Sequence, residues 1–270
     1  PGGEAAELTS LADLDAGTII LVGERAAVLP GLLSAAAAKA DATGARLAWI
    51  PRRAGDMGAI EAGCLPGLLP GGRLASDAAA RADVAAVWGA VSLPSAAGRD
   101  LPGILDAARD GGLAALVVGG IDLRDLPDPD AARDALRAAG FVVQLEVRRS
   151  EVTEFADVVL PVAPVHEKPG TFLNWEGRLR PFGQVLVSRA RSDRQVLARL
   201  TEEMGRDLGV DDLAALHTTR GELDGWDGAR GDAPRSPADA LPAPAAGEAV
   251  LATWRLMLDD ARGQDGEPHL

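Results

Sequence analysis

Short apolar runs alternate with alanine-rich segments of helical periodicity along most of this chain. The apolar runs, many of them rich in β-branched side chains, predict strands at residues 18–22, 47–50, 114–118, 141–145 and 158–160. The segments between and after them predict helices at residues 30–42, 77–88, 101–109, 129–139 and 193–208. This alternation predicts an α/β fold with a doubly wound, mostly parallel sheet, because a helix is the usual crossover between parallel strands.

The expected helix at residues 129–139 has the clearest boundaries. Asp128 is a favourable N-cap, Pro129 suits the first helical position, and Gly140 follows the last turn. The expected strand at residues 158–160 is apolar at every position and is followed by prolines. Such a run is typical of a strand that is buried on both faces of a parallel sheet.

Two segments lack a clear period. Residues 52–73 carry many Gly and Pro residues and predict a long irregular loop, a candidate for contact with another molecule. Residues 225–247 predict an exposed linker, and residues 249–258 predict a final amphipathic helix.

We therefore expect a partial α/β domain over residues 1–208 with a long loop or hairpin insertion. Short helices and a partly irregular linker are expected over residues 209–270. The chain lacks an initial Met, which indicates a fragment of a longer polypeptide.

Composition narrows the classes of protein to which the chain can belong. A length of 270 residues is sufficient for a large core, and 47% hydrophobic residues with only 3% aromatic ones predict a core of Ala, Val and Leu. The formal net charge of −13 argues against nucleic-acid binding, because affinity for phosphates comes from clustered Lys and Arg. No apolar run approaches the roughly 18 residues of a membrane span, and the first residues do not resemble a signal peptide. These features favour a cytoplasmic protein without direct membrane insertion.

Several kinds of site are excluded by missing residues. Cys64 is the only cysteine, and iron–sulfur clusters are held by about four thiolates. The three histidines, His166, His217 and His269, do not have the spacing of zinc ligands. The GxGxxG fingerprint, the P-loop and the GxSxG elbow are also absent. We therefore expect no catalytic residue and no metal ligand in this segment.

The densest group of polar and turn-forming residues lies in "ADVVLPVAPVHEKPGTFLNWEGR" at residues 156–178. Residues 171–174 and 178–181 predict two arms of a small hairpin, in which Gly177 supplies a positive φ. Asn174 is suited to bonding the backbone of the turn, and Glu176 and Arg178 are expected to share a charge-assisted hydrogen bond. These side chains either hold the loop in shape or contact a ligand. Paired glycines, Gly119 and Gly120, follow another strand at its carboxyl end, where open α/β sheets usually bind ligands.

The order "ADVVLP", a Glu, "GTF", an Asn and "EGR" resembles the signature of molybdopterin oxidoreductases. With "ILVGERAAVLPG" and "TGARLAWIPRRAGDMGAIEAGCLPGLLPGG", the chain resembles a narrower family, the large iron–sulfur subunit, or G subunit, of bacterial NADH:quinone oxidoreductase, respiratory complex I. The likeness covers residues from about 17 to 208. The residues that match the signature are Gly170, Thr171, Phe172, Asn174, Glu176, Gly177 and Arg178.

The resemblance implies that this segment is a non-catalytic scaffold that binds no cofactor itself. Iron–sulfur clusters are expected on cysteines in the missing N-terminal part of the full subunit, whose complex transfers electrons from NADH to quinone coupled to proton translocation. The implied partners are other subunits of the peripheral arm of complex I, at the inner face of the cell membrane. An alternative is a fragment of an active, formate dehydrogenase-like molybdopterin enzyme, with pterin near Gly119, Gly120 and the Gly170 loop. An unrelated α/β ligand-binding module is a third possibility.

Overall fold

A computed structural model of the chain describes residues 14–231 and 244–251, except positions 30, 52, 54, 211 and 250. These residues divide into two compact units. The first contains residues 14–57 and 173–178, together with 231 and 244–251, and the second contains residues 58–172 and 179–230. The sheets are mainly parallel and are connected by helices, which confirms the predicted mixed α/β class.

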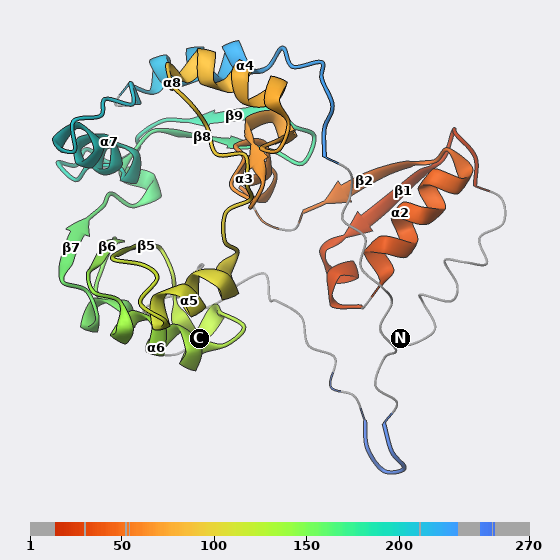
Figure 1. Cartoon of the computed structure of the whole chain (residues 1–270), viewed down its shortest axis with the longest axis horizontal. Helices are drawn as coiled ribbons and strands as arrows, with labels where there is room; N and C mark the ends of the chain where they lie inside the picture. Colours follow the sequence, from red (N-terminus) through yellow and green to blue (C-terminus); the bar gives the residue numbers. More distant parts are fainter. Residues whose placement is uncertain are drawn as a thin grey trace. The chain divides into compact units, whose positions relative to one another are not determined.

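The first unit is built around one strand–helix–strand crossover (Figure 1). Strand β1 (Ile19–Gly23) pairs in parallel with β2 (Arg46–Ile50). The short 3-10 helix η1 (Glu24–Val28) and helix α2 (Leu32–Thr43) lie between them in the chain. Gly44 follows α2 with a φ of 73°, a left-handed conformation that favours glycine and ends the helix. The predicted strands and helix are therefore confirmed to within two residues.

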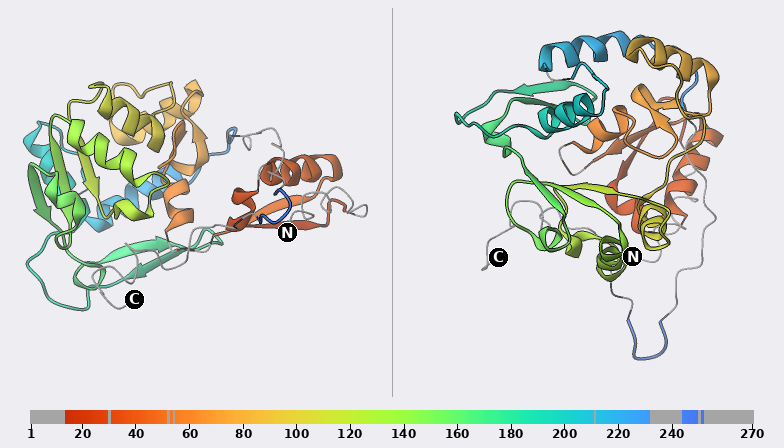
Figure 2. Two further views of the ribbon diagram at one scale, coloured as in Figure 1. Left: turned by 90° about the horizontal axis from the view of Figure 1, so that it is seen from below. Right: turned by 60° about the vertical axis from the view of Figure 1, so that its left-hand side comes forward.

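The second unit contains a three-stranded parallel sheet in the order β5–β6–β7, formed by β5 (Leu116–Gly119), β6 (Val142–Glu146) and β7 (Val158–Pro161). Helices α5 (Leu101–Arg109) and α6 (Pro129–Ala138) pack against each other on one side of this sheet (Figures 1 and 2).

The core between these helices and the sheet contains five buried side chains, those of Leu123, Ala132, Leu136, Val142 and Val152. Leu123 belongs to η3 (Leu123–Asp125) and Val152 to η4 (Glu151–Glu154). As predicted, Asp128 caps α6 by accepting from the backbone N–H of Ala131 at 2.9 Å.

The expectation that the last strand is buried on both faces is wrong. Val158 and Val159 of β7 are 37% and 40% exposed. The physical reason is position: β7 pairs only with β6 and forms an edge of the sheet. An edge strand also tolerates Pro161 as its last residue, because proline cannot donate a hydrogen bond to a further strand.

The long irregular loop predicted for residues 52–73 is also wrong, although Arg52 itself lies outside the described residues. This segment forms α3 (Asp56–Glu61), β3 (Leu68–Leu69) and η2 (Pro70–Gly72), after which β4 (Arg73–Leu74) pairs antiparallel with β3. The glycines that suggested irregularity make defined turns, since several have a φ near +75°. Arg73 donates back to the carbonyl oxygen of Pro70 at 2.6 Å and holds the tight connection.

A second core cluster joins this segment to two helices, α4 (Ala78–Trp88) and α8 (Leu213–Leu223). It contains the buried side chains of Leu69, Ala75, Val84 and Leu223. The N-cap of α4 is Asp77, whose side chain accepts from the backbone N–H of Ala79. Because Leu223 lies in this cluster, α8 is part of the packing of the second unit. The domain boundary at residue 208 stays a prediction.

The remaining elements lie after β7. They are η5 (Val165–Glu167), β8 (Gly170–Leu173), β9 (Leu179–Phe182) and α7 (Asp193–Glu203). Ser192 and Gln195 form the capping box of α7, and the helix ends before Gly205, whose φ is 76°. The predicted final helix at residues 249–258 and much of the predicted linker lie outside the described residues. None of the helices in the described ranges has both the length and the apolar character needed to cross a bilayer.

Candidate functional site

The signature residues form the hairpin of β8 and β9, whose turn is held by Asn174. The side-chain Oδ1 of Asn174 accepts from the backbone N–H groups of Glu176 at 3.1 Å and Arg178 at 2.8 Å. The backbone of Asn174 donates to the carbonyl oxygen of Arg178 at 3.0 Å and accepts from Gly177 at 2.9 Å. Gly177 has a φ of 78°, as its place in the turn predicts. The expected role of Asn174 in bonding the turn is therefore confirmed.

The contact between Glu176 and Arg178 is weaker than expected. The Oε2 atom of Glu176 lies 3.6 Å from Nε of Arg178, which is an ion pair and not the hydrogen bond that the sequence predicts. The same oxygen accepts from Nδ2 of Asn174 at 3.3 Å. The Arg178 side chain is 66% exposed, so water competes for it and the pair adds little stability.

The opposite strand of the hairpin leaves no room for a side chain at position 170, so a glycine is required there. A Cβ atom at this position would lie 2.4 Å from Cζ of Phe182, which is far inside van der Waals contact. The Phe182 ring stacks on Phe172 with 5.1 Å between centroids. Two signature residues, Gly170 and Phe172, are therefore explained by packing of aromatic rings within the hairpin.

Thr171 connects the hairpin to α8. Its Oγ1 atom lies 2.9 Å from Nε2 of His217, a hydrogen-bond distance between side chains 46 positions apart. Sequence reasoning missed His217 as a partner, because the spacing of the two residues follows no local pattern. The contact ties the signature strand to a helix of the second unit.

The polar side chains of the signature have partners within the protein. Asn174, Glu176 and Arg178 bond to one another or to the turn, and Thr171 bonds to His217. The space beside Gly170 is filled by the ring of Phe182.

Gly119 and Gly120 lie at the carboxyl end of β5, at the edge of the sheet where ligands usually bind. Both are exposed, and a Cβ atom on Gly120 would meet nothing within 4 Å. Asp122 follows them, and its carboxylate accepts from the side-chain Nε and Nη2 atoms of Arg124 at 3.1 and 2.8 Å. This hydrogen bonding outweighs desolvation and lowers the pKa of Asp122.

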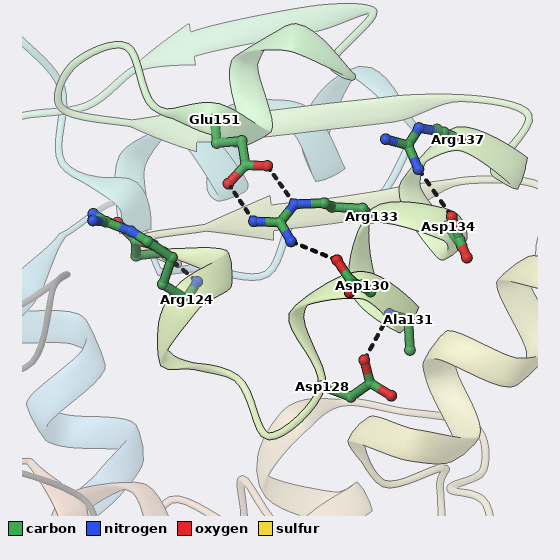
Figure 3. Close-up of polar contacts among 9 residues, drawn as sticks. Arg124, Asp128, Asp130, Ala131, Arg133, Asp134, Arg137 and Glu151 are labelled. Atoms are coloured by element: carbon green, nitrogen blue, oxygen red, sulfur yellow. Dashed lines mark hydrogen bonds and ion pairs between the residues drawn. The ribbon is translucent and has the colours of Figure 1, made fainter.

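Arg133 links α6 to η4 near the same edge (Figure 3). Its Nε and Nη2 atoms donate to the two carboxylate oxygens of Glu151 at 2.5 and 3.1 Å, and Nη1 donates to Asp130 at 2.8 Å. Such a two-point contact is the most specific geometry for Arg with a carboxylate. The hydrogen bonds from Arg133 lower the pKa of Glu151.

The Arg133–Glu151 pair predicts a pH dependence of stability. Because folding lowers the pKa of Glu151, the pair stabilises the fold above the ordinary Glu value of 4.5 and loses this effect as the pH falls through the lowered value. Glu151→Gln should therefore lower the melting temperature at neutral pH, and the difference from the parent should shrink in acid. Melting curves between about pH 7 and pH 3 measure the effect. In an Arg133→Gln background, Glu151→Gln should have no pH-dependent effect; a persistent one would contradict the pairing.

The turn of the hairpin gives a second prediction. Gly177→Val should lower the free energy of unfolding by about 1–3 kcal/mol, because a β-branched residue is strained at positive φ. A Cβ atom at this position meets nothing within 4 Å, so no steric clash adds to the cost. Denaturant unfolding measures the loss. Gly183→Val is the matched control, since Gly183 has no positive φ and also has open space; equal losses in the two variants would contradict the argument.

The described residues offer no metal centre. Within them, no group of three or more His, Cys, Asp or Glu side chains is arranged to hold a metal ion. Cys64 is a free, exposed thiol.

Residues 32–203 match the family model of molybdopterin oxidoreductases. The match covers more than half of the chain, so this chain belongs to the molybdopterin oxidoreductase family. Among its relatives, it is 54% identical to the G subunit of the NADH-quinone oxidoreductase of Mycobacterium tuberculosis over 281 aligned positions, which cover 100% of this chain and 35% of the relative. It is 55% identical to the corresponding G subunit of Streptomyces coelicolor over 94% of this chain and 31% of the relative. The predicted likeness to this subunit is confirmed.

A third relative belongs to a different class. A putative formate dehydrogenase of Bacillus subtilis is 34% identical over 55% of this chain and 15% of its own length. The chain spans about a third of the length of the two G subunits.

Proposed function

We propose that this chain is a scaffold portion of the G subunit of an NADH:quinone oxidoreductase and that this segment is itself non-catalytic. The complex would transfer electrons from NADH to quinone coupled to proton translocation. The observation that carries the proposal is the 54% identity to such a subunit along the whole of this chain. The contacts of the signature residues, within their hairpin and between Thr171 and His217, support a structural role for Gly170, Thr171, Phe172, Asn174, Glu176, Gly177 and Arg178.

The same proposal covers cofactors, partners and location. Iron–sulfur clusters would be bound by cysteines in the part of the subunit outside these 270 residues, since Cys64 alone cannot supply a ligand set. The partners would be other subunits of the peripheral arm, and the complex would lie at the cytoplasmic face of the cell membrane. Residues 1–208 would form the partial α/β domain, with residues 209–270 leading out of it.

A second candidate is a fragment of an active molybdopterin oxidoreductase. The similarity to a putative formate dehydrogenase favours it, as do the exposed Gly119 and Gly120 at the carboxyl end of β5. In that case a pterin would approach the backbone of these glycines. The ring of Phe182, which fills the space beside Gly170, argues against a contribution from that glycine.

Molybdenum retention distinguishes the two candidates. The purified chain is mixed with molybdopterin cofactor released from a molybdoenzyme, passed through a gel-filtration column and analysed for molybdenum and iron. The scaffold proposal predicts neither metal in stoichiometric amount. Retention of about one molybdenum per chain would overturn it, and loss of that retention in Gly120→Arg would place the cofactor at the carboxyl end of β5. Stoichiometric iron would contradict the argument from Cys64.

A further inference from the structure

Residues 178–191 run through β9 toward α7 and carry a surface unlike that of the rest of the chain (Figure 1). They contain four arginines and neither Asp nor Glu, whereas the whole chain has 27 Lys and Arg residues against 40 Asp and Glu residues. Three consecutive aliphatic side chains lie among them. Val185 is 77% exposed, Leu186 is 52% exposed and Val187 is 101% exposed. We call residues 178–191 the basic segment.

The described part of the chain does not neutralise the arginines of the basic segment. Arg180, Arg189 and Arg191 are exposed, and none of them pairs with a carboxylate of the described residues. Arg178 forms the exposed 3.6 Å pair with Glu176. Because carboxylates are abundant elsewhere in this chain, their absence here belongs to the segment and not to the composition. The result is a local positive charge on an acidic protein.

The backbone of the basic segment is held in place at two points. The N–H groups of Val185 and Leu186 both donate to the carbonyl oxygen of His166, at 3.0 and 2.9 Å. At the end of the segment, the carbonyl oxygen of Arg191 accepts from the N–H of Ala163 at 2.8 Å. The exposed side chains therefore project from an ordered backbone, which lowers the entropic cost of binding a partner.

We propose that the basic segment is the docking surface for an acidic segment of another polypeptide, with carboxylates opposite Arg189 and Arg191 and aliphatic side chains against Val185 and Val187. Charge complementarity carries the proposal, because the partner supplies the negative charge that this chain does not place there. Arginine is enriched at protein–protein interfaces, and adjoining exposed apolar side chains mark such sites. The inference deepens the proposed function, on which it rests for the presence of neighbouring subunits.

Other anionic partners fit this surface less well. A membrane or a nucleic acid presents an extended array of negative charge, which would also face the acidic remainder of a chain with a net charge of −13. A two-fold contact between copies centred on the basic segment would place arginines against arginines. A single polypeptide segment avoids both conflicts, because it touches the basic segment alone and can supply carboxylates and apolar side chains together.

Photo-crosslinking of the full-length protein in its cells tests the proposal. A benzophenone amino acid replaces Val187, and in a control protein it replaces Val91, which is 103% exposed and lies outside the basic segment. We expect the probe at position 187 to join another polypeptide, at a peptide with more Asp and Glu than Lys and Arg. A crosslink to a neutral or basic peptide, to lipid, to nucleic acid, to a second copy or within the same chain would overturn the proposal. So would a yield at position 187 no higher than that at position 91.

The identity of the captured polypeptide separates this inference from the proposed function. Capture of another subunit of an NADH:quinone oxidoreductase through an acidic peptide would support both. Capture of an unrelated protein through an acidic peptide would support the docking surface and count against the proposed function. Molybdenum retention tests the proposed function independently of the basic segment.

A second measurement tests the role of charge. The captured peptide is synthesised, and its dissociation constant for the full-length protein is measured by fluorescence anisotropy. Arg189→Glu combined with Arg191→Glu should raise this constant about tenfold, because two exposed ion pairs become like-charge contacts. Arg189→Lys combined with Arg191→Lys keeps the charge and should stay within about threefold of the parent.

Arg99→Glu combined with Arg109→Glu is the matched control for the charge reversal. Both arginines are exposed and lie outside the basic segment, so the dissociation constant should not change. Equal effects of the two double reversals, or no effect of the reversal at positions 189 and 191, would overturn the proposal.

Discussion

Arg73→Ala is expected to lower the free energy of unfolding of the second unit by about 3 kcal/mol, because a buried side chain is removed and carbonyl acceptors lose their donor. The Arg73 side chain is 1% exposed. Its Nη2 atom donates to Oδ2 of Asp83 at 2.7 Å and to the carbonyl oxygen of Leu223 at 2.8 Å, and Nη1 donates to Pro70 at 2.6 Å. The guanidinium also lies over the ring of Trp226, 5.0 Å from its centroid.

The cost comes mainly from the groups that Arg73 leaves behind. The carbonyl oxygens of Pro70 and Leu223 lose their charged donor. The contact with Leu223 is buried, and a buried acceptor without a partner costs about 1–3 kcal/mol. Asp83 contributes less, because its side chain is 42% exposed and water can replace the arginine. The deleted side chain also opens a cavity beside Trp226.

Urea unfolding followed by Trp fluorescence measures the loss. Arg73→Met retains much of the volume without the hydrogen bonds, so it separates bonding from packing. Arg109→Ala is the matched control, because Arg109 pairs with Asp106 on the surface, where both side chains are exposed. That change should cost less than about 0.5 kcal/mol. A loss for Arg73→Ala no larger than that for Arg109→Ala would contradict the structural role of the buried arginine.

Gly63→Ala is expected to cost about 3 kcal/mol, combining backbone strain with overpacking. Gly63 follows α3 with a φ of 79° and donates its N–H to the carbonyl oxygen of Ile60 at 3.0 Å. A Cβ atom here would lie 2.7 Å from the backbone carbon of Leu69 and 2.9 Å from the nitrogen of Pro70. Backbone atoms cannot rotate away as a side chain can, so α3 or the β3–β4 hairpin has to shift.

Gly89→Ala separates the two contributions. Gly89 also has a positive φ, 61°, but a Cβ atom there meets nothing within 4 Å. This variant should cost only the strain of a left-handed backbone, about 1–2 kcal/mol. Denaturant unfolding of both variants gives the difference. Equal losses would show that the close approach of Gly63 to Leu69 does not constrain the fold.

The helix boundaries and the hairpin turn were predictable because their interactions are local. Asp128 bonds to the N–H three residues later, and Asn174 bonds to N–H groups two and four residues later. Each such contact depends on a few neighbouring positions and leaves a pattern in the sequence. The alternation of strands and helices, and the signature that places the chain in its family, can be recognised in the sequence for the same reason.

Interactions between distant positions left no such pattern. Nothing near Arg73 in the sequence points to the carbonyl oxygen of Leu223, 150 positions away, and nothing near Thr171 points to His217. The prediction that β7 is buried failed because apolar composition does not reveal which strand occupies the edge of a sheet. The glycines at residues 52–73 indicated turns but not what the turns pack against. The sequence by itself thus determined the local elements, the turn chemistry and the family, since these depend on neighbours within about one turn of chain. Only the tertiary structure decided which residues are buried and paired, because those depend on contacts between segments far apart in the chain.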